Sequence, residues 1–305
     1  KIQTLVNSYE SILNAADGIG GNAPDPTLVD YTNIGVIGVN TAVEGNLLGD
    51  VIDAKNTVDV DTTGKIQALG IAVQAVMDAA GGTTDTPSKA QLESLGIIGV
   101  TDANLTIMQN AIRGTANDGS GVDTLSELQA LITTTANTVI VAINKIKDSA
   151  ESNNATATSP NVQDYLDATI SGVNNGNLSS INSALNTALV DGAATDTAAE
   201  IQALVSSYAT ILNAADGNDD NDTNPLQADY SRIGVTGIDT SQEQSLLGDV
   251  IDIQSNADVD TVAEVQALAN AVQAVMNAAS GALGVPSKAE LELLGITGVT
   301  DPNMD

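Results

Sequence analysis

The chain has 305 residues, 39 acidic and 9 basic, which gives a formal net charge of −30. Such a charge repels phosphate and argues against nucleic acid and anionic membranes as partners. Cys and His are absent, which excludes disulfides, thiolate catalysis, imidazole acid–base chemistry and His/Cys metal sites. Trp and Phe are also absent, but 42% of the residues are apolar, enough for a core of small aliphatic side chains. No apolar run approaches the roughly 18 residues of a membrane span.

Two nested repeats organise the chain. Residues 2–104 align without a gap with residues 201–303, and more than half of the aligned pairs are identical. A shorter repeat opens with an Ile-Gln-Ala-Leu element and carries a Gly-[Ile/Val]-x-Gly turn. It begins at Ile2, Ile66, Leu128, Ile201 and Val265. The pattern predicts an all-α tandem array of small three-helix units, four full and one partial, with an elongated form.

The predicted repeats have the following boundaries: 1–65, 66–127, 128–200, 201–264 and a partial repeat 265–305. The third repeat is longer than its siblings, and the extra residues indicate a longer first helix that runs to about Lys147. The segment Val139–Ile143 has strand propensity, but the repeat register favours helix. Both ends interrupt a repeat, so we expect the chain to be a piece of a longer array.

The first helix of each repeat has one apolar stripe, as in Ile2, Leu5, Tyr9 and Ile12. A Thr precedes it and predicts an N-cap. The Thr residues are Thr62, Thr124, Thr197 and Thr261, and a Glu completes a capping box at the last three.

The second helix is predicted to start at Ser88, Ser159 or Ser287, beside a proline, and to end at the first glycine of the turn. In the third repeat Thr169 replaces that glycine. The third helix is predicted to begin at a polar N-cap in every repeat: Asn40, Thr101, Asn174, Asp239 and Thr300.

One acidic loop approaches a calcium-binding pattern, with alternate oxygen ligands at Asp216, Asn218, Asp220 and Asp222. It has Asn221 where a calcium loop has glycine, and Gln227 where the bidentate Glu belongs. A solvated acidic loop is therefore the interpretation, with calcium as the alternative. No other cofactor is indicated, and no catalytic residue.

Three other groups of polar residues have structural interpretations. The carboxylate pairs Asp59/Asp61 and Asp258/Asp260 precede the Thr62 and Thr261 caps, which favours capping over hydrolysis. The tyrosines are expected in the core with the hydroxyl at its rim, with ligand stacking as the alternative: Tyr9, Tyr31, Tyr208 and Tyr230. Glu44 and Glu243 stand where the second repeat has Leu105, which indicates a face turned to solvent or to a neighbour.

The Thr-x-x-Glu-[Ile/Leu/Val]-Gln-Ala-Leu helix, its Ala-Ala-Asp-Gly end and the Gly-[Ile/Val]-x-Gly-Val-[Thr/Asn] turn resemble one family. They are similar to the GA-like three-helix repeats of very large bacterial cell-surface and RTX-type adhesins. The resemblance implies a secreted, surface-displayed array that spaces a binding domain away from the cell. No albumin-contact motif matches, so that activity is not carried over.

Two classes of function follow. The first is a non-enzymatic structural segment, a spacer or a filament-forming stretch, whose partners are neighbouring repeats or other copies. The second is an array of protein-binding modules that engages a host or partner protein. A binder predicts an exposed apolar stripe in every copy, whereas a spacer does not.

Overall fold

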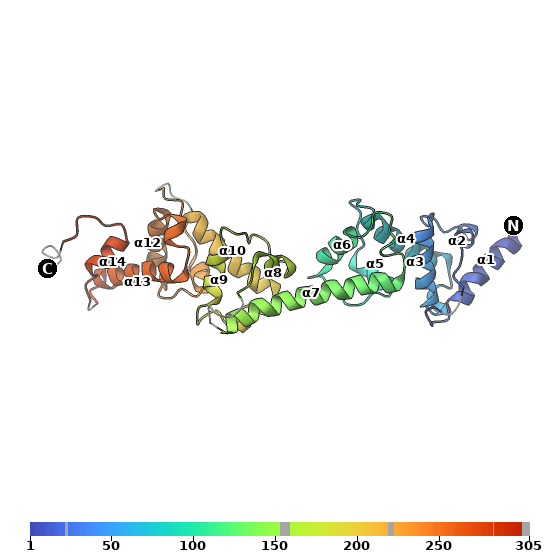
Figure 1. Ribbon diagram of the computed structural model, residues 1–305, viewed down its shortest axis with the longest axis horizontal. Helices are drawn as coiled ribbons and strands as arrows, with labels where there is room; N and C mark the ends of the chain where they lie inside the picture. Colours follow the sequence, from blue (N-terminus) through green and yellow to red (C-terminus); the bar gives the residue numbers. More distant parts are fainter. Residues whose placement is uncertain (22–23, 153–158, 219–222, 283, 301–305) are drawn as a thin grey trace. The chain divides into compact units, whose positions relative to one another are not determined.

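The computed structural model describes residues 1–21, 24–152, 159–218, 223–282 and 284–300. Within these ranges the protein is all-helical, with fourteen α-helices and three short 3₁₀ segments and no β-strand (Figure 1). Asp17 and Asn56 form an isolated antiparallel β-bridge. The all-α prediction is confirmed.

The chain divides into two compact units, residues 1–138 and 139–305. The first unit holds these helices: α1 (Ile2–Ala15), α2 (Leu28–Asn33), α3 (Ala42–Asp53), η1 (Thr57–Asp59), α4 (Thr63–Ala80), α5 (Lys89–Ser94), α6 (Leu105–Arg113) and the start of α7 (Leu125–Ser152). Within it α1 packs on α2, and α3 packs on α4.

The second unit repeats this order. It holds the end of α7, then α8 (Val162–Asp167), α9 (Leu178–Leu185), η2 (Gly192–Ala194), α10 (Ala198–Ala214), α11 (Gln227–Arg232), α12 (Ser241–Asp252), η3 (Asn256–Asp258), α13 (Val262–Ala279) and α14 (Lys288–Leu293). The corresponding pairs, α10 with α11 and α12 with α13, are again in contact.

Each compact unit has one apolar core that runs through several repeats. The first core joins Ile12 and Leu47 of the first repeat to Leu92 of the second and Leu128 of the third. The second core likewise joins residues of the third, fourth and fifth repeats. A repeat of about 64 residues buries too little surface to be secure alone, so neighbouring repeats share their cores.

The predicted caps of the first helices are present. Oγ1 of Thr62, Thr197 and Thr261 accepts a hydrogen bond from the backbone amide three residues later, and Thr124 does the same for Glu127. Each such cap satisfies one of the free amides at the helix start, worth about 1 kcal/mol.

The caps of the other helices correct the prediction at several positions. The third helices begin at Thr41 and Thr240 rather than Asn40 and Asp239, because Glu44 and Glu243 close a capping box there. In the second and third repeats a short turn comes first, and the N-caps are Asn104 and Asn177 in place of Thr101 and Asn174. A helix from Thr300 would lie outside the described residues.

The second helices of the second and fifth repeats begin at Ser88 and Ser287, as predicted. In the third repeat the N-cap is Asn161 rather than Ser159. Its Oδ1 accepts from the amides of Gln163 and Asp164, and Oδ2 of Asp164 accepts from the Asn161 amide. Asn161 therefore forms a complete capping box after Pro160.

Helix α7 is longer than predicted and ends at Ser152 rather than Lys147. Segment 139–143 is helical, as the register indicated. The buried side chains on α7 fall in two groups, Leu128 and Ile132, then Ala142, Ile146, Ser149 and Ala150, with none between. The first group belongs to the core of the first compact unit, and the apolar residues of the second group to the core of the second.

Candidate functional site: the junctions between repeats

The Gly-x-x-Gly turn ends each second helix in a left-handed conformation. Gly35 and Gly38 have φ values of 83° and 85°, and the other repeats follow them. The amide of Val36 bonds to the Tyr31 carbonyl oxygen, and that of Gly35 to Thr32, which is the closure expected of a helix that ends at a glycine. The turn leaves the backbone amide and carbonyl group of the residue after Val36, which is Ile37, pointing outward.

A glutamine from the next repeat binds those two backbone groups. The Oε1 of Gln67 accepts from the amide of Ile37 over 2.9 Å, and its Nε2 donates to the carbonyl oxygen of Ile37 over 2.9 Å. The carboxamide uses one acceptor and one donor at once, which fixes both its distance and its orientation. We call this pair of bonds the glutamine clasp.

The clasp occurs at four junctions. The amide and carbonyl distances are 2.9 and 3.1 Å for Gln129 with Ile98, 2.8 and 3.2 Å for Gln202 with Ser171, and 2.9 and 3.1 Å for Gln266 with Thr236. The turn residue varies in chemistry, whereas the glutamine does not vary. Where the turn residue is Ser171 or Thr236, its hydroxyl also donates to the glutamine Oε1, over 3.2 and 3.4 Å.

A second kind of hydrogen bond joins a repeat to the repeat that comes two places later in the chain. The amide of Leu125, at the start of α7, donates to Oδ2 of Asp50 on α3 over 2.9 Å. The matching amide of Val262, at the start of α13, donates to Oγ of Ser183 on α9 over 3.0 Å. The third helix of one repeat therefore also caps the first helix two repeats later.

Glu44 and Glu243 do not face open solvent, and the charge of Glu44 acts on Asp78 of the neighbouring second repeat. They are less than one-tenth exposed, and Oε2 of Glu243 accepts from the amides of Asp239 and Thr240 and from the Thr240 hydroxyl. Removal from water opposes ionisation of Glu243, but these hydrogen bonds hold its pKa below its usual range. Both residues are capping-box acids.

The carboxylate pairs serve local structure. Asp59 accepts from the Asn56 amide, and Asp61 pairs with Lys65 over 2.7 Å. In the later copy, bonds from Ser255 lower the pKa of Asp258. Desolvation, with the charge of Glu264, raises the pKa of Asp260. Asp260 lines a pocket of about 430 Å³ whose other polar residues are asparagines and one serine, so no acid–base pair faces that space.

The tyrosines lie deeper than predicted. Tyr31, Tyr208 and Tyr230 are fully buried, and only the half-buried Tyr9 fits the expectation of a hydroxyl at the rim. The Tyr208 hydroxyl donates to the carbonyl oxygen of Val259, whereas the Tyr31 and Tyr230 hydroxyls have no partner among the described residues. Burial raises the pKa of all three.

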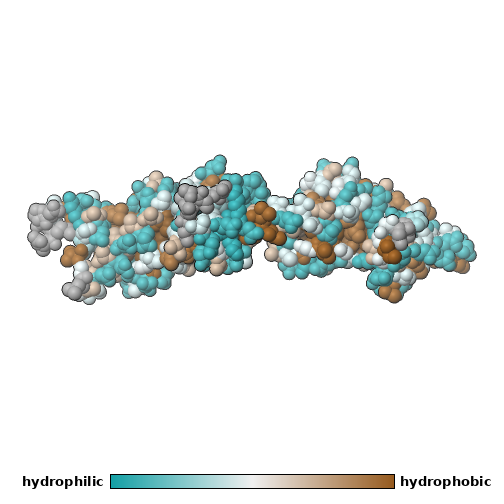
Figure 2. Space-filling view, turned by 60° about the horizontal axis from the view of Figure 1, so that its bottom comes forward, coloured by the Kyte–Doolittle hydropathy of each residue, from teal (hydrophilic) through white to brown (hydrophobic). Residues whose placement is uncertain are grey.

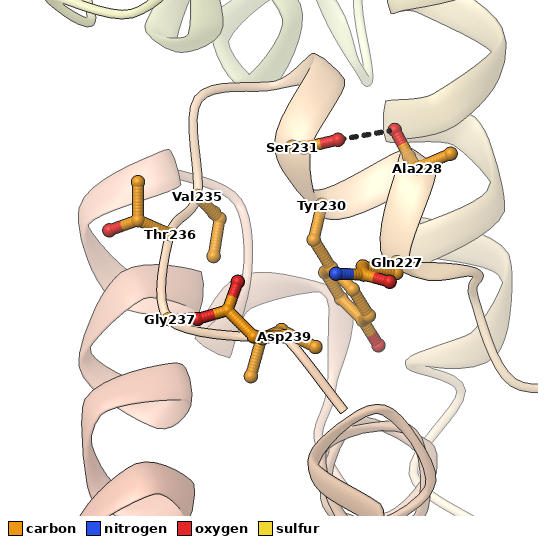
Figure 3. Close-up of a pocket in the computed structure, with 9 residues that line it drawn as sticks. Gln227, Ala228, Tyr230, Ser231, Val235, Thr236, Gly237 and Asp239 are labelled. Carbon is orange, nitrogen blue, oxygen red and sulfur yellow. Dashed lines mark hydrogen bonds between the residues drawn. The ribbon is translucent and has the colours of Figure 1, made fainter. Parts of the chain in front are cut away.

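Tyr230 also borders an open pocket of about 390 Å³ beside the fourth turn. Figure 3 shows residues of α11 and of the turn at 235–239 around this space. The Ser231 hydroxyl donates a hydrogen bond to the carbonyl oxygen of Ala228. Asp239 is the only carboxylate in the lining, so the pocket holds no acid–base dyad and no metal-ligand set.

Two of the four calcium candidates, Asp216 and Asn218, lie in the described chain. Asp216 Oδ1 accepts from the Asn218 amide over 2.8 Å, which is a local turn, and Asp220 and Asp222 lie outside the described residues. Among the residues that the structure describes, no group of three acidic, His or Cys side chains is placed to hold a metal ion.

Comparison with protein-family models, curated proteins and solved structures found no match to this chain. In the described part of the chain, no helix has the length and apolar character needed to cross a bilayer. The sequence indicated only one of the two partners at each junction. The invariant glutamine of the Ile-Gln-Ala-Leu element was the signal, but its partner is a backbone and leaves no residue pattern.

Proposed function

We propose that this chain is a non-enzymatic structural segment, a spacer of a large bacterial surface adhesin that acts outside the cell. The observation that carries the proposal is the glutamine clasp at four junctions. A spacer needs each repeat held in a fixed orientation on the last one. A two-bond contact to the backbone of the turn residue provides this for any number of repeats.

The long-range capping bonds support the same role. Because Asp50 and Ser183 hold the starts of first helices two repeats later, the first and the third repeat each contact two successors within their compact unit. The shared cores add apolar contact at the same junctions. These interactions favour a series of repeats whose order is maintained without metal or cofactor.

The second candidate, an array of protein-binding modules, is favoured by one observation. The turn residues Ile37 and Ile98 project from successive repeats and are 74% exposed. The later turns present Ser171 and Thr236 at the same place, so the apolar tip is not kept in every copy. On the face seen in Figure 2, apolar residues form small patches separated by polar ones. The spacer therefore remains the preferred function.

The clasp can be tested by replacing its glutamines one at a time. Gln129→Ala should increase hydrogen exchange at the Ile98 amide and lower the stability of the first compact unit by about 1 kcal/mol. Gln67→Ala should do the same at Ile37. Gln3→Ala is the matched control, since Gln3 bonds to Asn7 and to no turn. Unchanged protection at Ile98 in Gln129→Ala would contradict the clasp.

The spacer role is tested by small-angle X-ray scattering of the whole chain. A compact globule of 305 residues has a radius of gyration of about 19 Å by the size scaling. A series of repeats should give a clearly larger value, and more so at low salt because of the net charge of −30. A value near 19 Å would exclude an extended spacer.

A further inference from the structure

The middle of helix α7 contributes no buried residue to either core. The buried apolar residues of α7 up to Ile132 belong to the core of the first compact unit, and those from Ala142 onward belong to the core of the second. Residues 133–141 lie between them, all nine are described, and none is buried. In the corresponding helices α4 and α10, at most two consecutive residues separate one buried residue from the next. We call residues 133–141 the bare segment of α7.

The bare segment also has little intrinsic tendency to be helical. It reads Thr-Thr-Thr-Ala-Asn-Thr-Val-Ile-Val, so seven of its nine residues are β-branched. Such side chains lose rotamer freedom in a helix, and each is less favourable there than Ala, Leu or Lys. The segment contains no charged residue, so no ion pair between its successive turns supports the helix.

Two hydroxyl groups of the bare segment bond back to the helix backbone. Oγ1 of Thr135 donates to the carbonyl oxygen of Leu131 over 2.8 Å, and Oγ1 of Thr138 donates to that of Thr134 over 3.1 Å. In an α-helix the same two carbonyl oxygens accept from the amides of residues 135 and 138. Each hydroxyl therefore shares an acceptor on which the helix depends, an arrangement that slightly destabilises a helix and favours bending.

We propose that the bare segment is a labile joint, which opens from helix to extended chain while both compact units stay folded. A helical run without buried side chains depends on its own propensity, and a run of about nine such residues is marginal in water. Local opening of the segment therefore requires much less free energy than unfolding of either core. The boundary between the two compact units, at residues 138 and 139, falls inside this segment of the continuous helix α7 (Figure 1).

In a spacer this joint lets the chain lengthen under load, a use that rests on the proposed function. Nine residues span about 13 Å as an α-helix and about 30 Å as extended chain. A pull along the chain is then taken up within α7 before the buried contacts of either core are broken.

Hydrogen exchange of the full chain, followed amide by amide with NMR, tests the joint directly. The amides of residues 137–141 should exchange about a hundredfold faster, or more, than those of Ile146 and Ala150 on the same helix. Equal rates in the two parts of α7 would overturn the proposal.

A pair of proline variants compares the bare segment with a packed part of the same helix. Asn137→Pro breaks α7 inside the bare segment, so the urea midpoints of both compact units should stay at their wild-type values. Asn144→Pro is the matched control. Asn144 is also exposed, but it lies between the buried Ala142 and Ile146, so its replacement should lower the midpoint of the second unit. A lower midpoint of either unit in Asn137→Pro, or a wild-type midpoint in Asn144→Pro, would overturn the joint.

Independent unfolding of the two units is checked with the aligned leucines Leu48 and Leu247, which are both fully buried. Leu48→Ala should reduce hydrogen-exchange protection in urea only in the first unit, and Leu247→Ala only in the second. If either variant unfolds its own unit outright, the other unit should still show wild-type protection. Loss of protection in both units from one substitution would overturn the proposal. The radius of gyration of the wild type tests the spacer separately and depends on none of these results.

Discussion

The carboxamide of Asn224 donates a hydrogen bond to Oδ1 of Asp249 over 3.0 Å, where the first repeat places Asp25 opposite Asp50. The two sites are aligned copies, and both loops lie close to a helix glycine, Gly49 or Gly248. One copy therefore has an amide–carboxylate bond, and the other has two acids. Partial desolvation raises the pKa of Asp25, and the charges of Asp50 and Asp53 add to this.

The first prediction is that Asp25→Asn stabilises the first compact unit at neutral pH. With its pKa raised in the folded state, Asp25 binds its proton more tightly there, so stability falls as the pH rises through that pKa. The variant should gain up to about 1 kcal/mol at pH 7, limited because the side chain is solvent-exposed, and nothing near pH 3. Urea unfolding at the two pH values measures the difference.

The reciprocal variant Asn224→Asp is the matched control and should lose stability at pH 7 by a similar amount. Equal effects of Asp25→Asn at pH 3 and pH 7 would show that charge repulsion is not the cause.

The second prediction concerns Thr169, which has a φ of 68° at the first glycine position of the third turn. A β-branched residue in this region is strained, while the aligned glycines are not. Thr169 is exposed, so Thr169→Gly should lose little contact and gain about 1 kcal/mol of stability in the second compact unit.

Gly35→Ala provides the opposite test for the same conformation. A Cβ at Gly35 has open space around it, so any loss reflects its φ of 83° alone. We expect a loss of about 1 kcal/mol in chemical unfolding. A destabilised Thr169→Gly would mean that the threonine side chain makes a compensating contact.

The sequence predicted the helices well because the signals are local. Capping Thr residues, the apolar stripe and the paired glycines act over a few residues, and Thr62, Ser88 and Gly35 all have the predicted roles. The prediction of a cap position failed where two neighbouring polar residues could both serve as the N-cap. The prediction placed the cap at Asn40, but the next residue, Thr41, can also cap, and the capping box with Glu44 forms there.

Contacts between repeats were not predictable in the same way. The clasp of Gln129 joins a side chain to a backbone, and the bond from Leu125 to Asp50 joins a backbone to a side chain 75 residues away. Neither leaves a paired residue pattern. The cores also extend across repeats, which the apolar stripe of a single helix does not indicate.

The third prediction uses the capping box of Glu243. A lowered pKa in the folded state means that ionised Glu243 adds stability above its ordinary pKa, and that this is lost as the pH falls through the folded value. Glu243→Gln keeps an acceptor, as Gln91 does in the box of α5, but removes the charge. We expect a loss of about 0.5–1 kcal/mol at pH 7 that shrinks as the pH falls through the lowered pKa of the folded state.

Unfolding of Glu243→Gln and wild type across this pH range is the measurement. Glu10→Gln, which removes an exposed glutamate from α1, controls for the change in net charge. A loss for Glu243→Gln that stays constant down to pH 3 would point to packing rather than to ionisation.

The last prediction compares two buried tyrosines, one with a hydrogen-bond partner for its hydroxyl and one without a partner among the described residues. The Tyr208 hydroxyl donates to the carbonyl oxygen of Val259 over 3.1 Å, so Tyr208→Phe should cost about 1 kcal/mol of stability. The Tyr230 hydroxyl is buried without a partner among the described residues, so Tyr230→Phe removes an unpaired polar group and should be neutral or stabilising. Tyr9→Phe should fall between them, since its bond to the Val60 carbonyl is 3.5 Å long and the residue is half-buried. Urea unfolding of the three variants in one buffer gives the order, and a loss for Tyr230→Phe as large as that for Tyr208→Phe would indicate a partner for its hydroxyl in solution, such as a bound water.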